Sequence, residues 1–202
     1  HECFDPSGWP GLESLRSPGE GPRDMDYWQR QQRPRGYNEP GHAHELTFSC
    51  YQRFSFLSKK RTCEWLAAAI ATARTELNYS LWAYVFMPDH VHLIIFPNER
   101  EYNVSEFLKQ LKEPVSRQAV QYLKTEAPEW LPRIRVRRGQ RSEHHFWQSG
   151  RGHDRNIDSA RTLQKMIEYI HLNPVRKQFV EQACDWKWSS AGWFEGRALN
   201  GL

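Results

Sequence analysis

The chain has 202 residues and a mass of 24.0 kDa, enough for one domain with a hydrophobic core and short appendages. Its mean hydropathy is −0.82, and no run approaches the ~20 apolar residues that a membrane-spanning helix needs, so we expect a soluble, cytoplasmic protein. The net charge of +4 permits a polyanionic partner without requiring one. Four cysteines without CxxC spacing indicate neither a zinc knuckle nor a disulfide framework.

The composition divides the chain into three segments. Residues 1–40 hold six of the twelve prolines and five of the twelve glycines and show no apolar periodicity, which predicts a disordered extension. Residues 41–183 carry the periodic patterns of secondary structure, and we expect them to form one folded domain. Residues 184–202 are rich in Trp but aperiodic, and we expect a tail that packs on this domain.

Within the domain, alternation of apolar and polar residues predicts one strand, and helical spacing predicts the next element. Two short apolar runs around Pro88-Asp89 predict a hairpin, and a second helix follows, with a kink near Pro114. A fourth strand and a third helix, capped by Asn156 or Asp158, complete the pattern. The predicted strands are 46–50, 80–87, 90–96 and 144–148, and the predicted helices are 60–77, 104–122 and about 158–171.

The order β-α-β-β-α-β-α matches the ferredoxin-like split unit. We therefore predict an α+β fold, with an antiparallel sheet whose helices pack on one face, plus an added C-terminal helix that bears a tyrosine. The pair His42/His44 precedes the first strand, and we interpret it as loop surface.

His90 and His92 lie two residues apart in a predicted strand, so both imidazoles project from the same face. Two neutral imidazoles at this spacing can hold one metal ion, although an isolated His-x-His is more often a pair of solvated surface side chains. In the last helix, Tyr169 and Asn173 are four residues apart and share a face. Taken alone, a helical tyrosine is more often a residue at the edge of the core.

Two stretches together resemble a known family. Met87–Ile94 and Glu168–Arg176 are similar to motifs of the IS200-like HUH transposases with a single catalytic tyrosine, in particular the REP-associated tyrosine transposases. His144–Gln148 and Asp185–Ser190 also resemble that branch, and the similarity spans about residues 42–193. The two motifs occur in the order and on the elements expected for this family, so together they indicate it far more specifically than either motif alone.

The resemblance implies a chemistry for matching residues. His90 and His92 would bind Mg²⁺ or Mn²⁺, with Asn173 as third ligand where many relatives carry Gln. Tyr169 would attack single-stranded DNA at hairpin repeats, form a 5′-phosphotyrosine and free a 3′-hydroxyl. A phenol with an ordinary pKa near 10 attacks poorly unless a metal stabilises its phenolate. No nucleotide cofactor is expected, because the covalent link retains the bond energy and no GxxxxGK[ST] loop occurs.

Charge placement supports a nucleic-acid partner independently of the resemblance. Residues 109–141 contain nine basic and three acidic residues, a local charge of +6. Trp147 and its neighbour Phe146 are candidates for base stacking, although one of the two is expected to face the core. The predicted DNA-binding residues are Arg133, Arg135, Arg137, Arg138, Trp147, Arg151 and Arg155.

Three functions stay open at this point. The first is a metal-dependent tyrosine transposase or nickase, located in the cytoplasm with the nucleoid. The second is a domesticated repeat-binding protein with little or no cleavage activity. The third is a metallohydrolase that uses His90 and His92 but lacks an evident carboxylate base. The resemblance to the REP-associated branch favours a monomer, with a dimer as the alternative.

Overall fold

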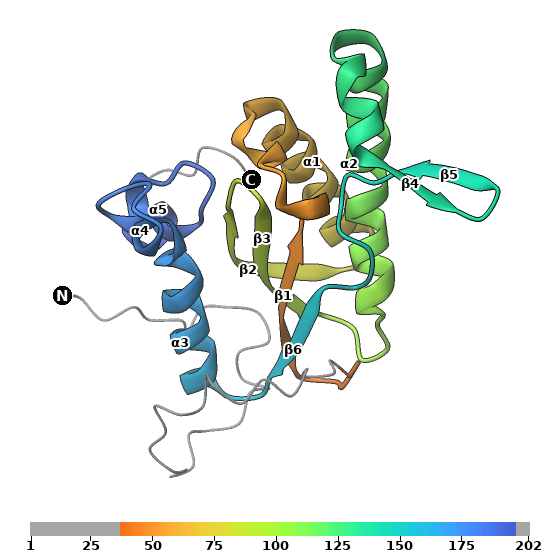
Figure 1. Cartoon of the computed structure of the whole chain (residues 1–202). Coiled ribbons are helices and arrows are strands. Elements are labelled where there is room, and N and C mark those ends of the chain that lie inside the picture. Colours follow the sequence, from red (N-terminus) through yellow and green to blue (C-terminus); the bar gives the residue numbers. More distant parts are fainter. Residues whose placement is uncertain (1–36, 197–202) are drawn as a thin grey trace.

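The structure, a computed structural model, describes residues 37–196, so most of the predicted extension and the last six residues lie outside the described part. Its centre is a four-stranded antiparallel sheet in the order β2-β3-β1-β6 (Figure 1). The tight turn that Pro88-Asp89 predicts joins β2 to β3. The strands are β1 Ala43–Ser49, β2 Tyr79–Phe86, β3 His90–Pro97 and β6 His153–Ile157.

Helices cover both faces of this sheet. Helices α1 (Lys60–Glu76) and α2 (Val104–Glu126) pack on one face, where Leu46, Leu93 and Phe107 belong to the larger core. Helix α3 (Ala160–His171) covers the other face, with Ile94, Phe96 and Ile167 in a second core. The α+β prediction is confirmed: two helices share one face, and the added tyrosine-bearing helix supplies the other layer (Figure 1).

The strand register places several polar side chains together on the α3 face. Thr47 of β1 pairs with His92 of β3 on one side and with His153 of β6 on the other. Because alternate residues of a strand share a face, Glu45 and His90 project from this same side. The central strands therefore carry a polar group beside the apolar contacts that hold α3.

Helix caps explain where two helices begin. The side chain of Asn103 accepts hydrogen bonds from the backbone N–H groups of Ser105 and Glu106 at the start of α2. Ser159 caps α3, not Asn156 or Asp158 as predicted. Helix α2 continues through Pro114 as one helix.

The predicted strand 144–148 is wrong. The chain instead forms a separate hairpin of β4 (Arg135–Arg138) and β5 (Arg141–His144), which projects from the body of the molecule (Figure 1). The fourth strand of the sheet is β6. Residues 146–148 contribute only an isolated antiparallel bridge, between Trp147 and Cys50 just after β1, and Phe146 and Trp147 are both buried.

The placement of His44 is a second correction. It lies inside β1 and is fully buried, and not on a surface loop. Its Nδ1 atom is 2.8 Å from Asp154 Oδ1 and its Nε2 atom is 2.9 Å from the Tyr102 hydroxyl. These two partners satisfy both ring nitrogens, which is the condition for burying an imidazole without a large cost.

Beyond α3 the chain returns to the edge of the sheet. It passes through α4 (Asn173–Arg176) and the short 3₁₀ turn η6 (Ala183–Asp185) and ends its described part after α5 (Ala191–Phe194). The carbonyl of Trp188 accepts from the Phe86 N–H, and Ser189 bridges Val85. The Trp-rich segment thus runs along β2. Within residues 37–196, no helix has the length and apolar character needed to cross a membrane.

Candidate active site

His90 and His92 form the centre of the candidate site. They project from β3 toward the α3 side, as the alternation predicts, and their ring centroids are 5.0 Å apart. His92 is only 7% exposed, and His90 is partly exposed at the start of the strand. The two imidazoles are therefore adjacent and held by the sheet rather than solvated on a free surface.

Both rings are oriented by partners at Nδ1. His90 Nδ1 lies 2.6 Å from Asp89 Oδ1, and His92 Nδ1 lies 2.7 Å from Thr47 Oγ1 and 3.3 Å from Glu45 Oε1. A carboxylate oxygen accepts, so these contacts favour the tautomer with the proton on Nδ1. In that tautomer each Nε2 keeps its lone pair for a ligand.

The charge state of His90 suits a metal ligand. Burial lowers the pKa of His90 below its ordinary value, while the hydrogen bond to Asp89 opposes that change. A ligating imidazole must be neutral, so burial favours the binding form. The donor set fits a divalent ion: two imidazole nitrogens, with oxygens of a phosphate or water as further ligands.

Glu45 is a functional candidate that our sequence reasoning missed. Its side chain is buried, with 4% of the residue exposed, and accepts a 2.6 Å hydrogen bond from Thr47 Oγ1. Its other oxygen is 3.5 Å from His153 Nε2. The signal was available in the sequence, because Glu45 and Thr47 are two apart in a predicted strand, but their pairing with His92 depends on the register.

Tyr169 lies opposite this group on α3. An amphipathic stripe that includes Leu163, Ile167 and Ile170 fixes the helix on the sheet. The Tyr169 ring meets the His92 ring edge-on, with centroids 6.4 Å apart, and the residue is 37% exposed. The structure therefore brings the predicted nucleophile beside a predicted metal ligand of the same chain, on a side open to solvent.

Arg176 adds a cation at the tyrosine. Its guanidinium carbon lies 4.6 Å from the centroid of the Tyr169 ring, and Nη1 donates a 3.0 Å hydrogen bond to the Tyr169 carbonyl. A fixed guanidinium at this place is suited to hold a phosphate oxygen. We did not assign a role to Arg176 from the sequence, although it belongs to the same motif.

The predicted third metal ligand is engaged elsewhere. Asn173 donates from Nδ2 to the carbonyls of Tyr169 and Ile170, at 3.1 and 3.2 Å, and so satisfies the end of α3. Only its carbonyl oxygen would remain for a metal. The described residues contain no cluster of three or more His, Cys, Asp or Glu side chains placed to hold an ion. The role of Asn173 as a ligand stays a prediction.

The C-terminal segment holds the tyrosine helix on its own sheet. His171, two residues after Tyr169, is buried, and its Nε2 lies 2.7 Å from Ser190 Oγ. Ser190 Oγ in turn accepts from the Tyr84 N–H on β2 at 2.9 Å. Burial lowers the pKa of His171 to about 4, so this imidazole is neutral at pH 7.

The predicted DNA-binding arginines fall into two groups. Arg133 follows Trp130 in the 3₁₀ helix η5 (Pro128–Ile134), and β4 carries Arg135, Arg137 and Arg138. Arg133, Arg135 and Arg137 are exposed. The second group lies at β6: exposed Arg151 precedes the strand and contacts Asp154 at 3.4 Å, and Arg155, within the strand, is partly buried beside α3.

Trp147 is placed differently from our prediction. It is 6% exposed, meets Phe48 edge-on at 5.1 Å and donates from Nε1 to the Lys112 carbonyl. Phe146 is buried as well, so both residues of the pair pack in the core, and not one as expected. With its faces covered by the protein, the Trp147 ring offers no platform for a base.

Comparisons with known proteins bear on this arrangement. A family model described as transposase IS200 like matches residues 41–173, more than half of the chain. A Haemophilus influenzae protein named as a REP-associated tyrosine transposase is 26% identical over 144 residues, which cover 68% of this chain and 77% of that protein.

Two solved transposase structures were compared with this chain for similarity of fold. A REP-associated tyrosine transposase bound to a REP hairpin superposes with a TM-score of 0.63 at 20% identity, covering 82% of this chain and 86% of that one. A transposase structure from Deinococcus radiodurans has 23% identity and a TM-score of 0.40, covering 69% and 95%. The first supports the α+β architecture described above, and the second is too distant to add to it.

Proposed function

Because the chain belongs to the IS200-like transposase family, we propose that it cleaves and rejoins single-stranded DNA at hairpin repeats through a covalent link to Tyr169. The membership confirms the resemblance read from the two motifs and makes the protein a DNA-processing enzyme of the transposase class. The observation that supports the specific chemistry is the placement of Tyr169 beside His92, with the tyrosine on a solvent-open side of the site.

In the proposed reaction, Tyr169 is the nucleophile and Arg176 contacts the phosphate. The Tyr169 oxygen attacks a phosphorus atom, a bond to phosphorus forms, and the bond to the 3′ oxygen breaks. The phenolic proton is lost and the leaving 3′ oxygen takes up a proton, which gives a 5′-phosphotyrosine and a free 3′-hydroxyl. Attack by another 3′-hydroxyl reverses these changes and rejoins DNA without a nucleotide cofactor. Arg176 is placed to hold a phosphate oxygen during both steps.

His90 and His92 would hold a divalent ion, Mg²⁺ or Mn²⁺, through Nε2, with Asn173 as the further candidate ligand. When bound, this ion supplies Lewis-acid stabilisation of the negative charge on the phosphate oxygens. Asp89, Thr47 and Glu45 keep the two imidazoles in one orientation and one tautomer.

The proposed substrate is a REP-type hairpin with a single-stranded flank. One solved relative is bound to a REP hairpin, and exposed arginines on η5 and β4 give this chain a surface suited to a phosphate backbone. The enzyme would act as a monomer, since Tyr169 and the histidines meet within one chain and His171 and Ser190 tie α3 to its own sheet. It would work in the cytoplasm, with the nucleoid.

A covalent-adduct assay tests this function. The full chain is incubated with Mn²⁺ or Mg²⁺ and labelled hairpin oligonucleotides from the repeats of its own genome, and products are separated on denaturing gels. We expect a slow-migrating band that needs metal, Tyr169 and both histidines. Hairpin binding without any adduct, across repeats and ions, would instead favour the domesticated repeat-binding protein. Hydrolysis without an adduct would favour the metallohydrolase.

A further inference from the structure

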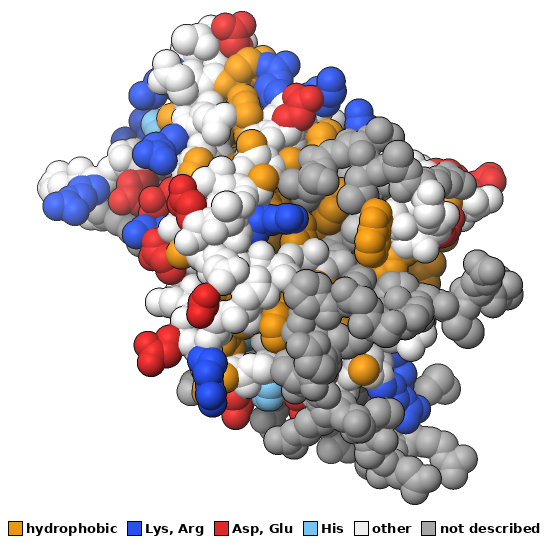
Figure 2. Space-filling model, turned by 180° about the vertical axis from the view of Figure 1, so that it is seen from behind, with side chains coloured by type: hydrophobic (Ala, Val, Ile, Leu, Met, Phe, Trp, Pro, Cys, Tyr) orange, Lys and Arg blue, Asp and Glu red, His pale blue; other side chains and the backbone are white. Residues whose placement is uncertain are grey.

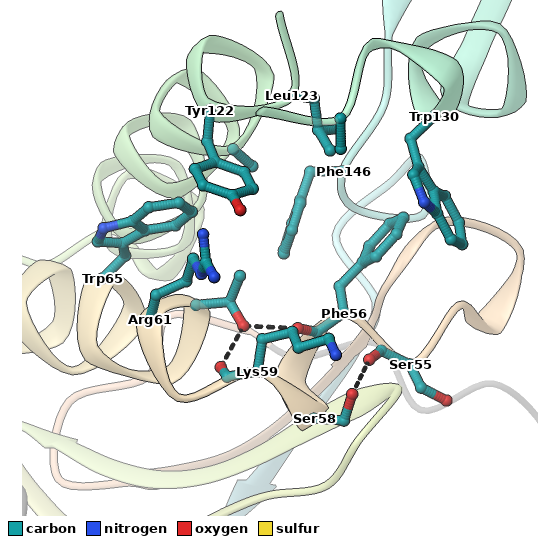
Figure 3. Close-up of a pocket in the computed structure, with 13 residues that line it drawn as sticks. Ser55, Phe56, Ser58, Lys59, Arg61, Trp65, Tyr122, Leu123, Trp130 and Phe146 are labelled. Carbon is teal, nitrogen blue, oxygen red and sulfur yellow. Dashed lines mark hydrogen bonds between the residues drawn. The ribbon is translucent and has the colours of Figure 1, made fainter. Parts of the chain in front are cut away.

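A second hollow lies away from the tyrosine site, on the side of the sheet covered by α1 and α2. It is a cavity of about 460 Å³ between the first turns of α1 and the C-terminal part of α2 (Figure 3). The 3₁₀ turn η4 (Phe56–Ser58), the helix η5 and Phe146 complete its walls. Its volume falls in the range of ligand pockets, roughly 300–1,000 Å³.

Aromatic rings make up much of the lining. Phe56 stacks on Phe146 with ring centroids 5.0 Å apart and meets Trp130 edge-on at 5.9 Å. On the other side, Tyr122 meets Trp65 at 6.2 Å. Figure 3 shows these rings around one space, with the Tyr122 hydroxyl directed into it. All except Phe146 are partly exposed, so these rings are not closed off from solvent.

Basic side chains border the same rings. The Arg61 guanidinium lies 4.0 Å from the centroid of the Tyr122 ring, and Lys59 also lines the cavity. Arg133 lies 4.7 Å from the Trp130 ring centroid. No Asp or Glu is among the lining residues in the described chain. Figure 2 shows hydrophobic, basic and some acidic side chains mixed at the end of the molecule where α2 ends.

The chain connects this cavity to the tyrosine site. The backbone N–H of Leu57 donates to the carbonyl of Pro88, and Arg53 Nη1 lies 3.2 Å from Asp89 Oδ2. Asp89 is also the partner of His90. The cavity and the histidines thus lie at the same end of the sheet, and residues 51–58 run between them.

We propose that this cavity binds an unpaired nucleobase of single-stranded DNA, while Arg61 and Lys59 hold the adjoining phosphates. The inference rests on the proposed function, which supplies a single-stranded substrate. Every base presents a π face to aromatic rings, and cations beside those rings match the charge of the backbone. An apolar protein segment would gain from the rings but would bring no negative charge to these cations, so DNA is the occupant that the lining favours.

The test compares single-stranded and paired DNA on the full chain. Binding of labelled dT8 and of a blunt duplex is measured by fluorescence anisotropy for the wild type, Tyr122→Leu and Arg61→Gln. Trp193→Leu is the matched control, because Trp193 is an exposed aromatic residue outside the cavity. We expect about tenfold weaker dT8 binding in both cavity variants, because Tyr122→Leu removes a stacking ring and Arg61→Gln removes a phosphate contact. The change for the duplex should be less than about twofold.

Photo-crosslinking gives a readout that does not depend on variant stability. Wild-type protein is irradiated with dT8 carrying one 5-iodouracil, and the crosslinked peptide is expected to contain Tyr122 or Trp130. The inference fails if dT8 binds the variants as well as it binds wild type, if dT8 does not bind, or if crosslinks map elsewhere. Equal losses for dT8 and duplex would also overturn it. Each of these results leaves the proposed function standing when Tyr169 still forms its adduct on hairpin DNA.

Discussion

Glu45 of β1 and His92 of β3 lie diagonally across these neighbouring strands, with Glu45 Oε1 3.3 Å from His92 Nδ1. The carboxylate is almost completely buried, and Thr47 donates to it from between the two residues. A buried carboxylate behind a ligating imidazole fixes the ring and increases its basicity. The strand register therefore determines how His92 would be oriented in the proposed metal site.

Replacement of Glu45 tests this connection. Glu45→Gln keeps the size of the side chain but removes its charge, and we expect Mn²⁺ affinity to fall by about 10–100-fold. Titration calorimetry with Mn²⁺ measures the affinity, and adduct formation at saturating Mn²⁺ should be largely restored. Glu143→Gln is the control, because Glu143 is exposed on β5. Unchanged Mn²⁺ affinity in Glu45→Gln would show that the carboxylate has no influence on the site.

Gly152 allows β6 to approach β1. Its φ of +81° favours glycine, and a Cβ at this position would collide with the Thr47 carbonyl oxygen. We expect Gly152→Ala to lower the free energy of unfolding by about 2–4 kcal/mol, measured by urea denaturation.

Gly150→Ala is the matched control for the close approach. Gly150 also has positive φ, +97°, but a Cβ there meets nothing within 4 Å. Gly150→Ala should lower the free energy of unfolding by only about 1–2 kcal/mol, which is the cost of backbone strain alone. Equal losses in the two variants would mean that the contact with Thr47 does not matter.

The buried His171 should make stability depend on pH. Its pKa is about 4 in the folded protein against an ordinary 6.5, so unfolding takes up a proton between these values. The stabilisation is complete above pH 6.5 and is lost as the pH falls toward 4, by roughly 3 kcal/mol in total. Urea denaturation at pH 7.5, 6 and 5 should therefore show a weaker decline for His171→Gln. Parallel declines would contradict this assignment.

Exposed arginines of β4 should contribute to DNA affinity through phosphate contacts. Arg135→Ala and Arg137→Ala are each expected to weaken hairpin binding and reduce the slope of log K against log salt by about one unit. Arg74→Ala, an exposed arginine in the last turn of α1, serves as the control. A salt slope that stays constant in both β4 variants would place the phosphate backbone elsewhere on the protein.

The sequence predicts local elements well where one period dominates. The apolar spacing of 60–77 and the alternation around His90 and His92 both correspond to elements in the structure. The prediction of a strand at 144–148 fails, because Phe146 and Trp147 are both buried by tertiary contacts that no local period encodes. The prediction of a surface loop at His44 is wrong for a related reason. A polar residue next to a Gly- and Pro-rich segment is typical of a loop, and only the structure shows its buried partners Asp154 and Tyr102.

The same division holds for the site. Tyr169, His90 and His92 could be predicted because they lie within short motifs. Glu45 and Arg176 depend on contacts between segments or turns, namely the β1–β3 register and the turn after α3. A single sequence specifies no register, so the contact of Glu45 with His92 emerges only from the structure.

The proposed function depends on Tyr169 as the nucleophile. The most direct measurement compares wild type and Tyr169→Phe with labelled hairpin oligonucleotides and Mn²⁺, scoring the covalent band on denaturing gels and hairpin affinity by anisotropy. We expect the variant to lose the band completely and keep its affinity within about twofold, because only the attacking hydroxyl is removed. A covalent band of wild-type intensity in Tyr169→Phe, or no band from wild type with any repeat hairpin, would contradict the claim.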